Sequence, residues 1–144
     1  FDMVAYDIDP ARNERFAGLG AKIANGPAGV AQGASTVICI VETTAQVREV
    51  VLGDGGIIEG AQEGDIFVCS ATIDPLAVKE MHAILAGKGI KMLDAPVSGG
   101  VPRAVSGDLS IIVGGDGAVA FVGRRPAVGL TDGDAILFGN ISCT

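Results

Sequence analysis

Three short apolar runs, separated by segments with helix-start signals, constrain the fold of this chain more than any other feature. The runs are Thr36–Val41, Ile66–Cys69 and Ile90–Leu93. Apolar runs of about four to eight residues between turn residues are typical of strands buried on both faces of a sheet. Asp74-Pro75, between the second and third runs, combines a helix cap with a first-turn proline. Strand and helix therefore alternate, which predicts an α/β fold with a doubly wound parallel sheet.

The alternation extends toward both ends of the chain. We expect additional strands at 3–6, 109–113 and 135–138. We also expect a helix from Asp9-Pro10 to the Gly18/Gly20 pair, a short helix from Gly26-Pro27 to about Gly33, and a helix capped by Thr44. Leu19 is expected to face inward. Leu76 is expected to share one apolar face with Met81, Ile84 and Leu85 on the helix that Asp74 begins.

Composition is that of a single acidic globular domain. At 144 residues, 49% of them hydrophobic, the chain is long enough to bury one core. The net charge of −7, with no Lys/Arg cluster beyond Arg124-Arg125, argues against binding along a nucleic-acid backbone. The acidity is compatible with a dinucleotide, because such sites hold the pyrophosphate with backbone amides and a helix N-terminus.

Cysteine spacing argues against a metal site and against a disulfide framework. Cys39 and Cys69 fall inside predicted strands, Cys143 lies in the tail, and no C-x-x-C pair occurs. We expect buried free thiols, which suit a reducing cytoplasm. No apolar run approaches the length of a membrane span, and Phe1 begins no secretory signal pattern, so no membrane partner is expected.

The segment Asp94–Gly100, which reads Asp-Ala-Pro-Val-Ser-Gly-Gly, directly follows the third apolar run. Glycine lets a backbone come close to a ligand, and successive N–H groups in such a turn form an anion-binding concavity. The Ser98 hydroxyl beside Gly99 and Gly100 favours capture of a small carboxylate. An ordinary glycine-rich turn is the alternative interpretation.

Asp7 follows the expected strand at 3–6. An acid at the tip of a second Rossmann strand accepts the hydroxyls of an adenosine ribose and repels a 2′-phosphate, and a capping role is equally compatible with the sequence. Asp9, directly before Pro10, is the expected cap. A glycine-rich turn should lie about 20 residues before a ribose-binding acid. Only six residues precede Asp7, and no G-x-G-x-x-G follows a strand elsewhere in the sequence.

Four segments together resemble the β-hydroxyacid dehydrogenases, a family that includes 3-hydroxyisobutyrate dehydrogenase and tartronate semialdehyde reductase and has 6-phosphogluconate dehydrogenase as a relative. The segments are Tyr6–Pro10, Val41–Thr44, Ser70–Pro75 and Asp94–Gly100, and Leu109–Gly115 continues the match. The resemblance covers about residues 3–116. It implies a Rossmann-like domain of an NAD(P)-dependent oxidoreductase that acts on the CH–OH group of a small 3-hydroxy acid.

The resemblance also implies roles for the matching residues. Ser98, Gly99 and Gly100 would bind the substrate, whereas Val41, Glu42 and Thr72 would contact the cofactor. Asp7 would favour NAD over NADP. Many relatives have proline where this chain has Glu42, a departure that concerns only this cofactor contact.

Parts of the family enzyme have no counterpart in these residues. The family's first strand and glycine-rich turn would precede Phe1, and its acid/base lysine would follow Ser98, whereas the lysines here are Lys22, Lys79, Lys88 and Lys91. We therefore expect a partial NAD(P)-binding domain over 1–139, a tail of unassigned structure over 140–144, and no helical second domain. Without the central first strand, two inner sheet edges would lack a partner.

Two functions from different classes are compatible with these observations. The first is the cofactor- and substrate-binding part of a dehydrogenase, inactive alone and binding NAD weakly at most. The second is a non-catalytic Rossmann-like binding or interaction module that has lost the lysine. The absent glycine-rich turn favours the first, and a homo-oligomer is possible only for the full-length enzyme. Weaker candidates are His82 as a rim residue, Asp94 as an acid or turn-stabilising residue, and Arg103 as a carboxylate-binding or solvated residue.

Overall fold

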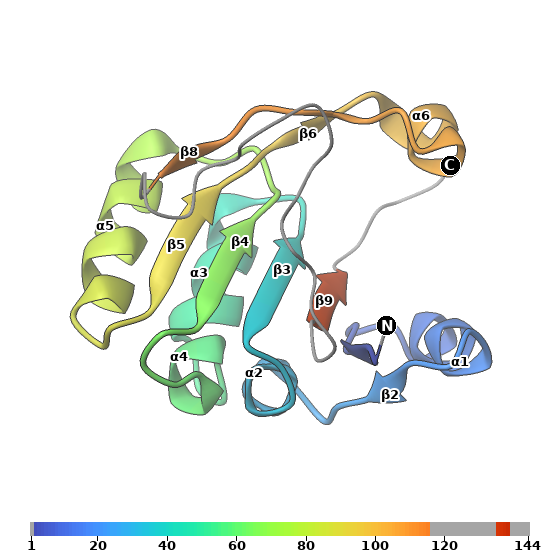
Figure 1. The fold of residues 1–144 in the computed structure, drawn as a ribbon, viewed down its shortest axis with the longest axis horizontal. Coiled ribbons are helices and arrows are strands. Elements are labelled where there is room, and N and C mark those ends of the chain that lie inside the picture. Colours follow the sequence, from blue (N-terminus) through green and yellow to red (C-terminus); the bar gives the residue numbers. More distant parts are fainter. Residues whose placement is uncertain (1, 116–134, 139–144) are drawn as a thin grey trace.

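The centre of the molecule is a parallel ladder of three strands that match the three apolar runs. In the computed structural model, which describes residues 2–115 and the backbone of 135–138, these strands are β3 (Thr36–Ile40), β4 (Ile66–Cys69) and β5 (Lys91–Asp94). They form one sheet with two further strands, in the order β8-β5-β4-β3-β9. Figure 1 shows the arrows of β3, β4 and β5 pointing the same way. The expected α/β fold with a mostly parallel sheet is confirmed.

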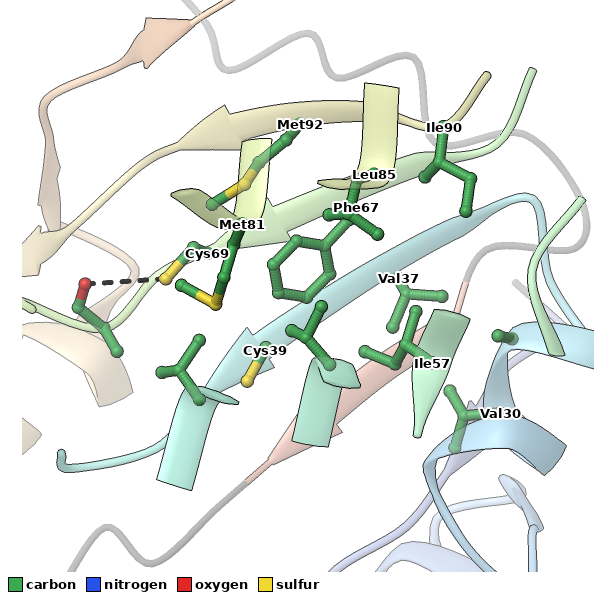
Figure 2. Close-up of a cluster of buried hydrophobic side chains, with 14 of the residues drawn as sticks. Val30, Val37, Cys39, Ile57, Phe67, Cys69, Met81, Leu85, Ile90 and Met92 are labelled. Carbon is green, nitrogen blue, oxygen red and sulfur yellow. Dashed lines mark hydrogen bonds between the residues drawn. The ribbon is translucent and has the colours of Figure 1, made fainter. Parts of the chain in front are cut away.

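The register of the ladder places apolar side chains side by side on both faces of the sheet. Val37 pairs with Phe67, and Phe67 pairs with Met92. All three belong to the main core cluster, and Figure 2 shows them among the other side chains of this cluster. Residues at alternate positions, Val68 and Leu93, are buried in a second cluster. Side chains of successive strand residues point to opposite faces, so the middle of the sheet is buried on both sides.

Helices from four consecutive parts of the chain supply the rest of the main core. They are α2 (Pro27–Gln32), α3 (Thr44–Leu52), α4 (Ile57–Gly60) and α5 (Pro75–Ala86). The ion pair between Arg48 of α3 and Glu80 of α5 joins two of these helices at the surface, with 2.5 Å between Nη2 and Oε2. Among the described residues, no helix has the length and apolar character needed to cross a membrane.

The helix caps agree with the sequence in two cases and differ in one. Asp9 and Asp74 cap α1 (Pro10–Gly18) and α5, their side chains accepting the N–H of Ala11 and Leu76. The cap of α3 is Thr43 and not Thr44, because Gln46 completes a capping box with Thr43. The hydroxyl of Thr44 instead accepts the N–H of Asp74.

Three apolar residues do not lie where helical spacing predicted. Leu19 is 79% exposed, Leu76 is 71% exposed and Ile84 is 39% exposed. Met81 and Leu85, of the same predicted face as Leu76 and Ile84, are fully buried. Leu19 ends α1, whereas Leu76 lies in the first turn of α5 and Ile84 in its last turn. At these helix ends the spacing of apolar residues alone does not determine which side chains the neighbouring layer covers.

The N-terminal residues form a small unit of their own. It consists of β1 (Val4–Ala5), α1 and β2 (Lys22–Ile23), and β1 pairs in parallel with β2. Strand β2 was not expected, because it is two residues long and both are exposed, which leaves no hydrophobic pattern to detect. Ala5 is fully buried, and its neighbours Val4 and Tyr6 pack against the main core.

The sequence after β5 is more varied than the expected turn and single strand. It forms β6 (Val97–Ser98), α6 (Gly100–Ser106), β7 (Ser110–Ile111) and β8 (Gly114–Gly115). β6 pairs antiparallel with β7, and β8 pairs antiparallel with β5. The strand expected at 109–113 is therefore reduced to β7, which lies outside the main sheet, and β8 gives the main sheet one antiparallel edge.

Strand β9 (Ala135–Phe138) confirms the expected strand at 135–138. It also provides a partner for one of the two inner sheet edges that were expected to lack one. It pairs in parallel with β3, with Ile38 opposite Ile136. β9 lies between β3 and β1 in Figure 1. A segment far away in the sequence therefore occupies the position beside β3 that the absent first strand was expected to leave vacant. The tail of unassigned structure expected over 140–144 lies outside the described residues.

We predict that proline substitution will reveal the pairing of β9 with β3. Successive N–H groups of a parallel strand point to opposite sides, so only one of Ile136→Pro and Leu137→Pro removes a hydrogen bond to β3. That variant should lose about 1 kcal/mol of unfolding free energy relative to the other, measured by urea denaturation. Equal stability of the two variants would contradict the pairing.

The two described cysteines lie side by side in the core. Cys39 of β3 pairs with Cys69 of β4 in the ladder, and both are free and buried, as the sequence predicted. Burial raises the pKa of the Cys69 thiol from 9.0 to about 11 and also raises the pKa of Cys39. The Cys69 thiol donates to the carbonyl of Ala71 at 3.8 Å, the contact dashed in Figure 2. Cys143 lies outside the described residues.

These thiols predict a loss of stability at alkaline pH. Above pH 9.0 the unfolded chain releases thiol protons that the folded chain retains until about pH 11 at Cys69. Each buried thiol should therefore lower the unfolding free energy by about 1.4 kcal/mol per pH unit in this window. Cys69→Ala should remove about half of that slope, measured by urea denaturation at pH 8, 9 and 10. An unchanged slope would contradict this account.

Candidate functional site

The candidate residues lie on loops that leave one edge of the sheet. Because β3, β4 and β5 are parallel, their carboxyl ends meet at the same edge. Val41 and Glu42 follow β3, Thr72 follows β4, and the segment from Asp94 onward follows β5. In open α/β sheets this edge is where ligands bind. The structure thus brings the loops of three predicted contacts to one side of the molecule.

The loop after β3 is held by the cap of α3. The side-chain oxygen of Gln46 accepts the N–H groups of both Glu42 and Thr43, each at 3.0 Å. Val41 is partly buried and packs against the main core. The Glu42 side chain is exposed. The backbone of this loop is therefore fixed, while the acidic side chain faces solvent.

The loop after β4 is connected to its neighbours on both sides. The N–H of Ser70 donates to the carbonyl of Cys39 at 2.8 Å, extending the ladder by one residue. Ser70 and Ala71 are buried, and Thr72 is exposed. Further along, the N–H of Asp74 donates to the Thr44 hydroxyl at 3.2 Å. Thr72 thus lies on a short loop that is anchored at both ends.

Asp94 lies at the end of β5 beside a cavity of about 620 Å³. Lys79 and His82 of α5 line the same cavity, together with Met92. Partial burial raises the pKa of the Asp94 carboxyl above its usual value. His82, expected at the surface or a rim, therefore lines a cavity wall. Ser98, Gly99 and Gly100 are not among the residues that line it.

The Ser98–Gly100 segment joins a short strand to a short helix. Ser98 pairs with Ser110. Ser98, Gly99 and Gly100 are all exposed. Gly99 and Gly100 have φ of +139° and +65°, which L side chains rarely adopt. A Cβ on Gly99 would lie 2.7 Å from Cδ of Arg103. The side chain of Arg103 on α6 therefore runs over the glycine backbone, next to the predicted carboxylate-binding groups.

The structure separates the two roles considered for the N-terminal acids. Asp9 caps α1, and its N–H donates to Oδ1 of Asp7 at 2.9 Å. Asp7 is buried, with 2% of its surface exposed. Oδ1 of Asn13 accepts the backbone N–H of Asp7, and Nδ2 of Asn13 donates to the backbone carbonyl of Asp7, each at 2.8 Å. Asp7 is therefore not the helix cap, and its buried carboxylate accepts the Asp9 N–H and lies beside Arg12.

Asn13 and Arg12 were not singled out from the sequence. Their positions four and three residues after the Asp9 cap place both on the first turns of α1, close to the loop that carries Asp7. Asn13 contacts the Asp7 backbone, and Arg12 contacts its carboxylate. The cap at Asp9 was the available signal, because it fixes which α1 residues face back toward β1.

Comparison with known proteins agrees with this geometry. The family profile described as the NAD binding domain of 6-phosphogluconate dehydrogenase matches residues 1–123. The chain belongs to the β-hydroxyacid dehydrogenase family. The resemblance inferred from Asp7, Thr72 and the Asp94–Gly100 segment is thereby confirmed, and the domain is an NAD-binding domain of oxidoreductases of the 3-hydroxyisobutyrate dehydrogenase type.

Relatives within the β-hydroxyacid dehydrogenases cover most of this chain. Mitochondrial 3-hydroxyisobutyrate dehydrogenase of Bos taurus is 35% identical over 115 residues, which are 80% of this chain and 34% of that protein. NAD-dependent L-serine dehydrogenase of Pseudomonas aeruginosa is 34% identical over 126 residues, 88% of this chain and 40% of that protein. The chain therefore spans between a third and two fifths of the length of these curated relatives.

A solved structure of the same family confirms the fold. The structure of Mycobacterium tuberculosis 3-hydroxyisobutyrate dehydrogenase with L-serine aligns with a TM-score of 0.75 and 23% identity. The alignment covers 96% of this chain and 55% of that chain. At this identity the likeness concerns the fold, which is the Rossmann-like architecture expected from the strand and helix alternation.

The described residues fit part of an NAD molecule. Asp7 follows β1, the position at which a Rossmann acid meets the adenosine ribose, and the loops after β3 and β4 lie at the ligand-binding edge of the sheet. Within 2–115 and 135–138, no glycine-rich turn joins a strand to a helix in the way that a pyrophosphate requires. In the same ranges, no three metal-ligating side chains come together.

We predict that Gly99→Ala will be destabilising. An L residue at φ +139° is strained and its Cβ would displace Arg103, at a cost of about 1–3 kcal/mol. Gly18→Ala is the matched control, because nothing lies within 4 Å of a Cβ at Gly18 and alanine favours the helix. Thermal unfolding should show a lower Tm for the first variant only. A Tm for Gly99→Ala equal to that of the control would exclude the strained geometry.

Proposed function

We propose that this chain provides the cofactor- and substrate-binding surface of an NAD-dependent dehydrogenase acting on the CH–OH group of a small 3-hydroxy acid. The observation that carries the proposal is the position of the Asp94–Gly100 segment. It follows β5 directly at the carboxyl edge of a parallel sheet, beside the loops that carry Glu42 and Thr72. Ligands of doubly wound folds bind at this edge, and the family match supports the reaction class.

Each candidate residue has a role within this proposal. Asp7 accepts the ribose hydroxyls of the adenosine, which favours NAD over NADP. Val41 and Glu42 line the cofactor, and Thr72 lies near the nicotinamide ribose. When bound, the cofactor supplies the hydride chemistry, and the protein supplies orientation.

The substrate carboxylate is proposed to bind at Ser98, Gly99 and Gly100. The backbone of the two glycines is open because no side chain of their own covers it, and the Ser98 hydroxyl is exposed beside it. The Arg103 side chain lies against Gly99, with Cδ 2.7 Å from the position that a Cβ of Gly99 would take. We propose that its guanidinium adds a positive charge beside a small carboxylate that receives hydrogen bonds from the Ser98 hydroxyl and the backbone amides.

We propose further that these 144 residues bind ligands without completing the reaction. Transfer of a hydride from a CH–OH group also requires a group that takes the hydroxyl proton. The lysines Lys22, Lys79, Lys88 and Lys91 all precede Ser98, and none follows the substrate segment as the family lysine does. Residues 1–139 are proposed as the partial NAD(P)-binding domain, with 140–144 as a tail.

Two further expectations belong to this proposal. The buried free thiols Cys39 and Cys69 are compatible with a reducing cytoplasm, although the bovine relative is a mitochondrial protein by its name. A homo-oligomer is proposed for the intact enzyme only, and neither nucleic acid nor membrane is proposed as a partner.

The proposal predicts separate binding of cofactor and substrate. Added NAD⁺ should shift the amide NMR signals of Asp7 and its neighbours, and 3-hydroxyisobutyrate should shift those of Ser98, Gly99 and Gly100. Ser98→Ala and Arg103→Gln should each weaken binding of the acid about tenfold, since each removes one charge-assisted contact. Arg48→Gln is the control, because its only described ion pair joins α3 to α5 at the surface.

Three outcomes would count against the proposed function. No shift at Ser98–Gly100 with 3-hydroxyisobutyrate, glycerate or threonate would remove the substrate assignment. NADH formation from any of these acids by the purified chain would show that it needs no further residue. Absence of nucleotide binding in every variant would favour the non-catalytic module instead.

A further inference from the structure

The cavity beside Asp94 has no role in the proposed function. Its volume is about 620 Å³, and α5, β5 and β8 each supply part of its wall. Figure 1 shows these three elements together at the outer edge of the main sheet, where β8 is the last strand. Pockets that hold small organic ligands are typically about 300–1,000 Å³. The cavity is therefore of a suitable size for such a ligand.

Polar side chains of opposite character line different walls of this cavity. Lys79 and His82 come from α5, where residues three apart are neighbours on the helix surface, and Asp94 ends β5. Lys79 is exposed, and His82 and Asp94 are half-buried, so a ligand can reach all three side chains. A ligand would thus meet nitrogen donors on the helix wall and a carboxylate on the strand wall.

The carboxylate of Asp94 has no partner of its own in the part of the chain that the structure describes. No ion pair or side-chain hydrogen bond there joins it to Lys79 or His82. Partial burial raises the pKa of the Asp94 carboxyl above its usual value. Burying a charge without a partner is unfavourable. A ligand that brings a positively charged group to Asp94 would remove this cost.

The remaining wall of the cavity is apolar. Met92 belongs to the main core, and Val78 packs against the same core. On the β8 side, a Cβ at Gly114 would meet no atom within 4 Å, so this wall is open. A ligand that fills the cavity should therefore carry an apolar group as well as its two charges.

We propose that this cavity binds an α-amino acid with an apolar side chain. The carboxylate of the ligand lies at Lys79 and His82, and its ammonium group lies at Asp94. Its side chain lies against Val78 and Met92. A zwitterion is favoured over a simple acid or amine, because only a zwitterion has a partner for both polar walls. The proposal concerns a site other than Ser98–Gly100, so it does not rest on the proposed dehydrogenase function.

The first test is an NMR titration of the 144-residue chain with L-leucine and two analogues. L-Leucine should shift the amide signals of Lys79, His82 and Asp94. 4-Methylpentanoic acid lacks the ammonium group, and 3-methylbutylamine lacks the carboxylate. Each analogue should bind about tenfold more weakly than leucine or worse, since each loses one charge-assisted contact.

The second test crosses the ligands with variants of the two polar walls. Asp94→Asn should weaken leucine and the amine about tenfold and leave the acid unchanged, whereas Lys79→Gln should weaken leucine and the acid and leave the amine unchanged. Lys91→Gln and Asp54→Asn are the controls, because both residues are exposed and neither lines the cavity. Gly114→Leu adds bulk at the open wall and should weaken all three ligands.

The outcomes decide between this assignment and a cavity without a ligand. Equal affinity for leucine, the acid and the amine would overturn the proposal, as would a loss of leucine binding without the crossed pattern in the two variants. No leucine binding to the unmodified chain would also overturn it and would leave the proposed function intact. If Asp94→Asn does not give a folded NMR spectrum, the three ligands on the unmodified chain and on Lys79→Gln still test the proposal.

Discussion

The parallel ladder of β3, β4 and β5 is the constraint on which the rest of this structure depends. Its register places Val37, Phe67 and Met92 in one row and so gives helices α2 to α5 a continuous apolar surface to cover. The same register aligns the ends of the three strands. Because the strands run in one direction, the loops that leave them emerge at one edge. Core packing and the position of the candidate site are thus two results of one pairing pattern.

Around this ladder, side chains form hydrogen bonds with the backbone groups of the loops. Without these side chains, the backbone groups would have no partner in the protein. Gln46 binds the backbone after β3, and the Thr44 hydroxyl binds the backbone of the helix cap that follows β4. Asn13 does the same for Asp7. These contacts use side chains at the N-terminal ends of helices, where N–H groups have no partner within the helix. The helix starts therefore organise the ligand-binding edge.

Much of this fold could be predicted from the sequence, and the parts that could not share a physical cause. Runs such as Thr36–Ile40 and caps such as Asp74 are local signals, because a few neighbouring residues decide them. Strand β2 is short and exposed, so it leaves no pattern. The Thr43/Thr44 choice depended on which threonine could pair with Gln46. Helix α6 begins at Gly100, directly after Gly99, and this pair of glycines indicated a turn when considered alone.

Some residues of the candidate site could likewise be predicted from the sequence, and others could not. The Asp94–Gly100 segment could be found because it resembles a family segment, whereas its residue types alone are also compatible with an ordinary glycine-rich turn. Arg12 could not be found in that way, since an arginine in a first helical turn is common and its contact with Asp7 exists only after α1 has formed. The passage of Arg103 over Gly99 likewise depends on the positive φ of that glycine. Such contacts belong to tertiary structure and have no sequence signature.

The pairing of β9 with β3 has a consequence for how the chain folds. Ile38 and Ile136 are neighbours in the sheet although most of the chain lies between them in sequence. Closing so long a loop is entropically costly before any contact rewards it, and such non-local pairings slow folding. During synthesis β3 would emerge long before its partner strand. Until β9 arrives, its edge would offer unpaired backbone groups to other chains, so we expect folding yield to depend on protein concentration.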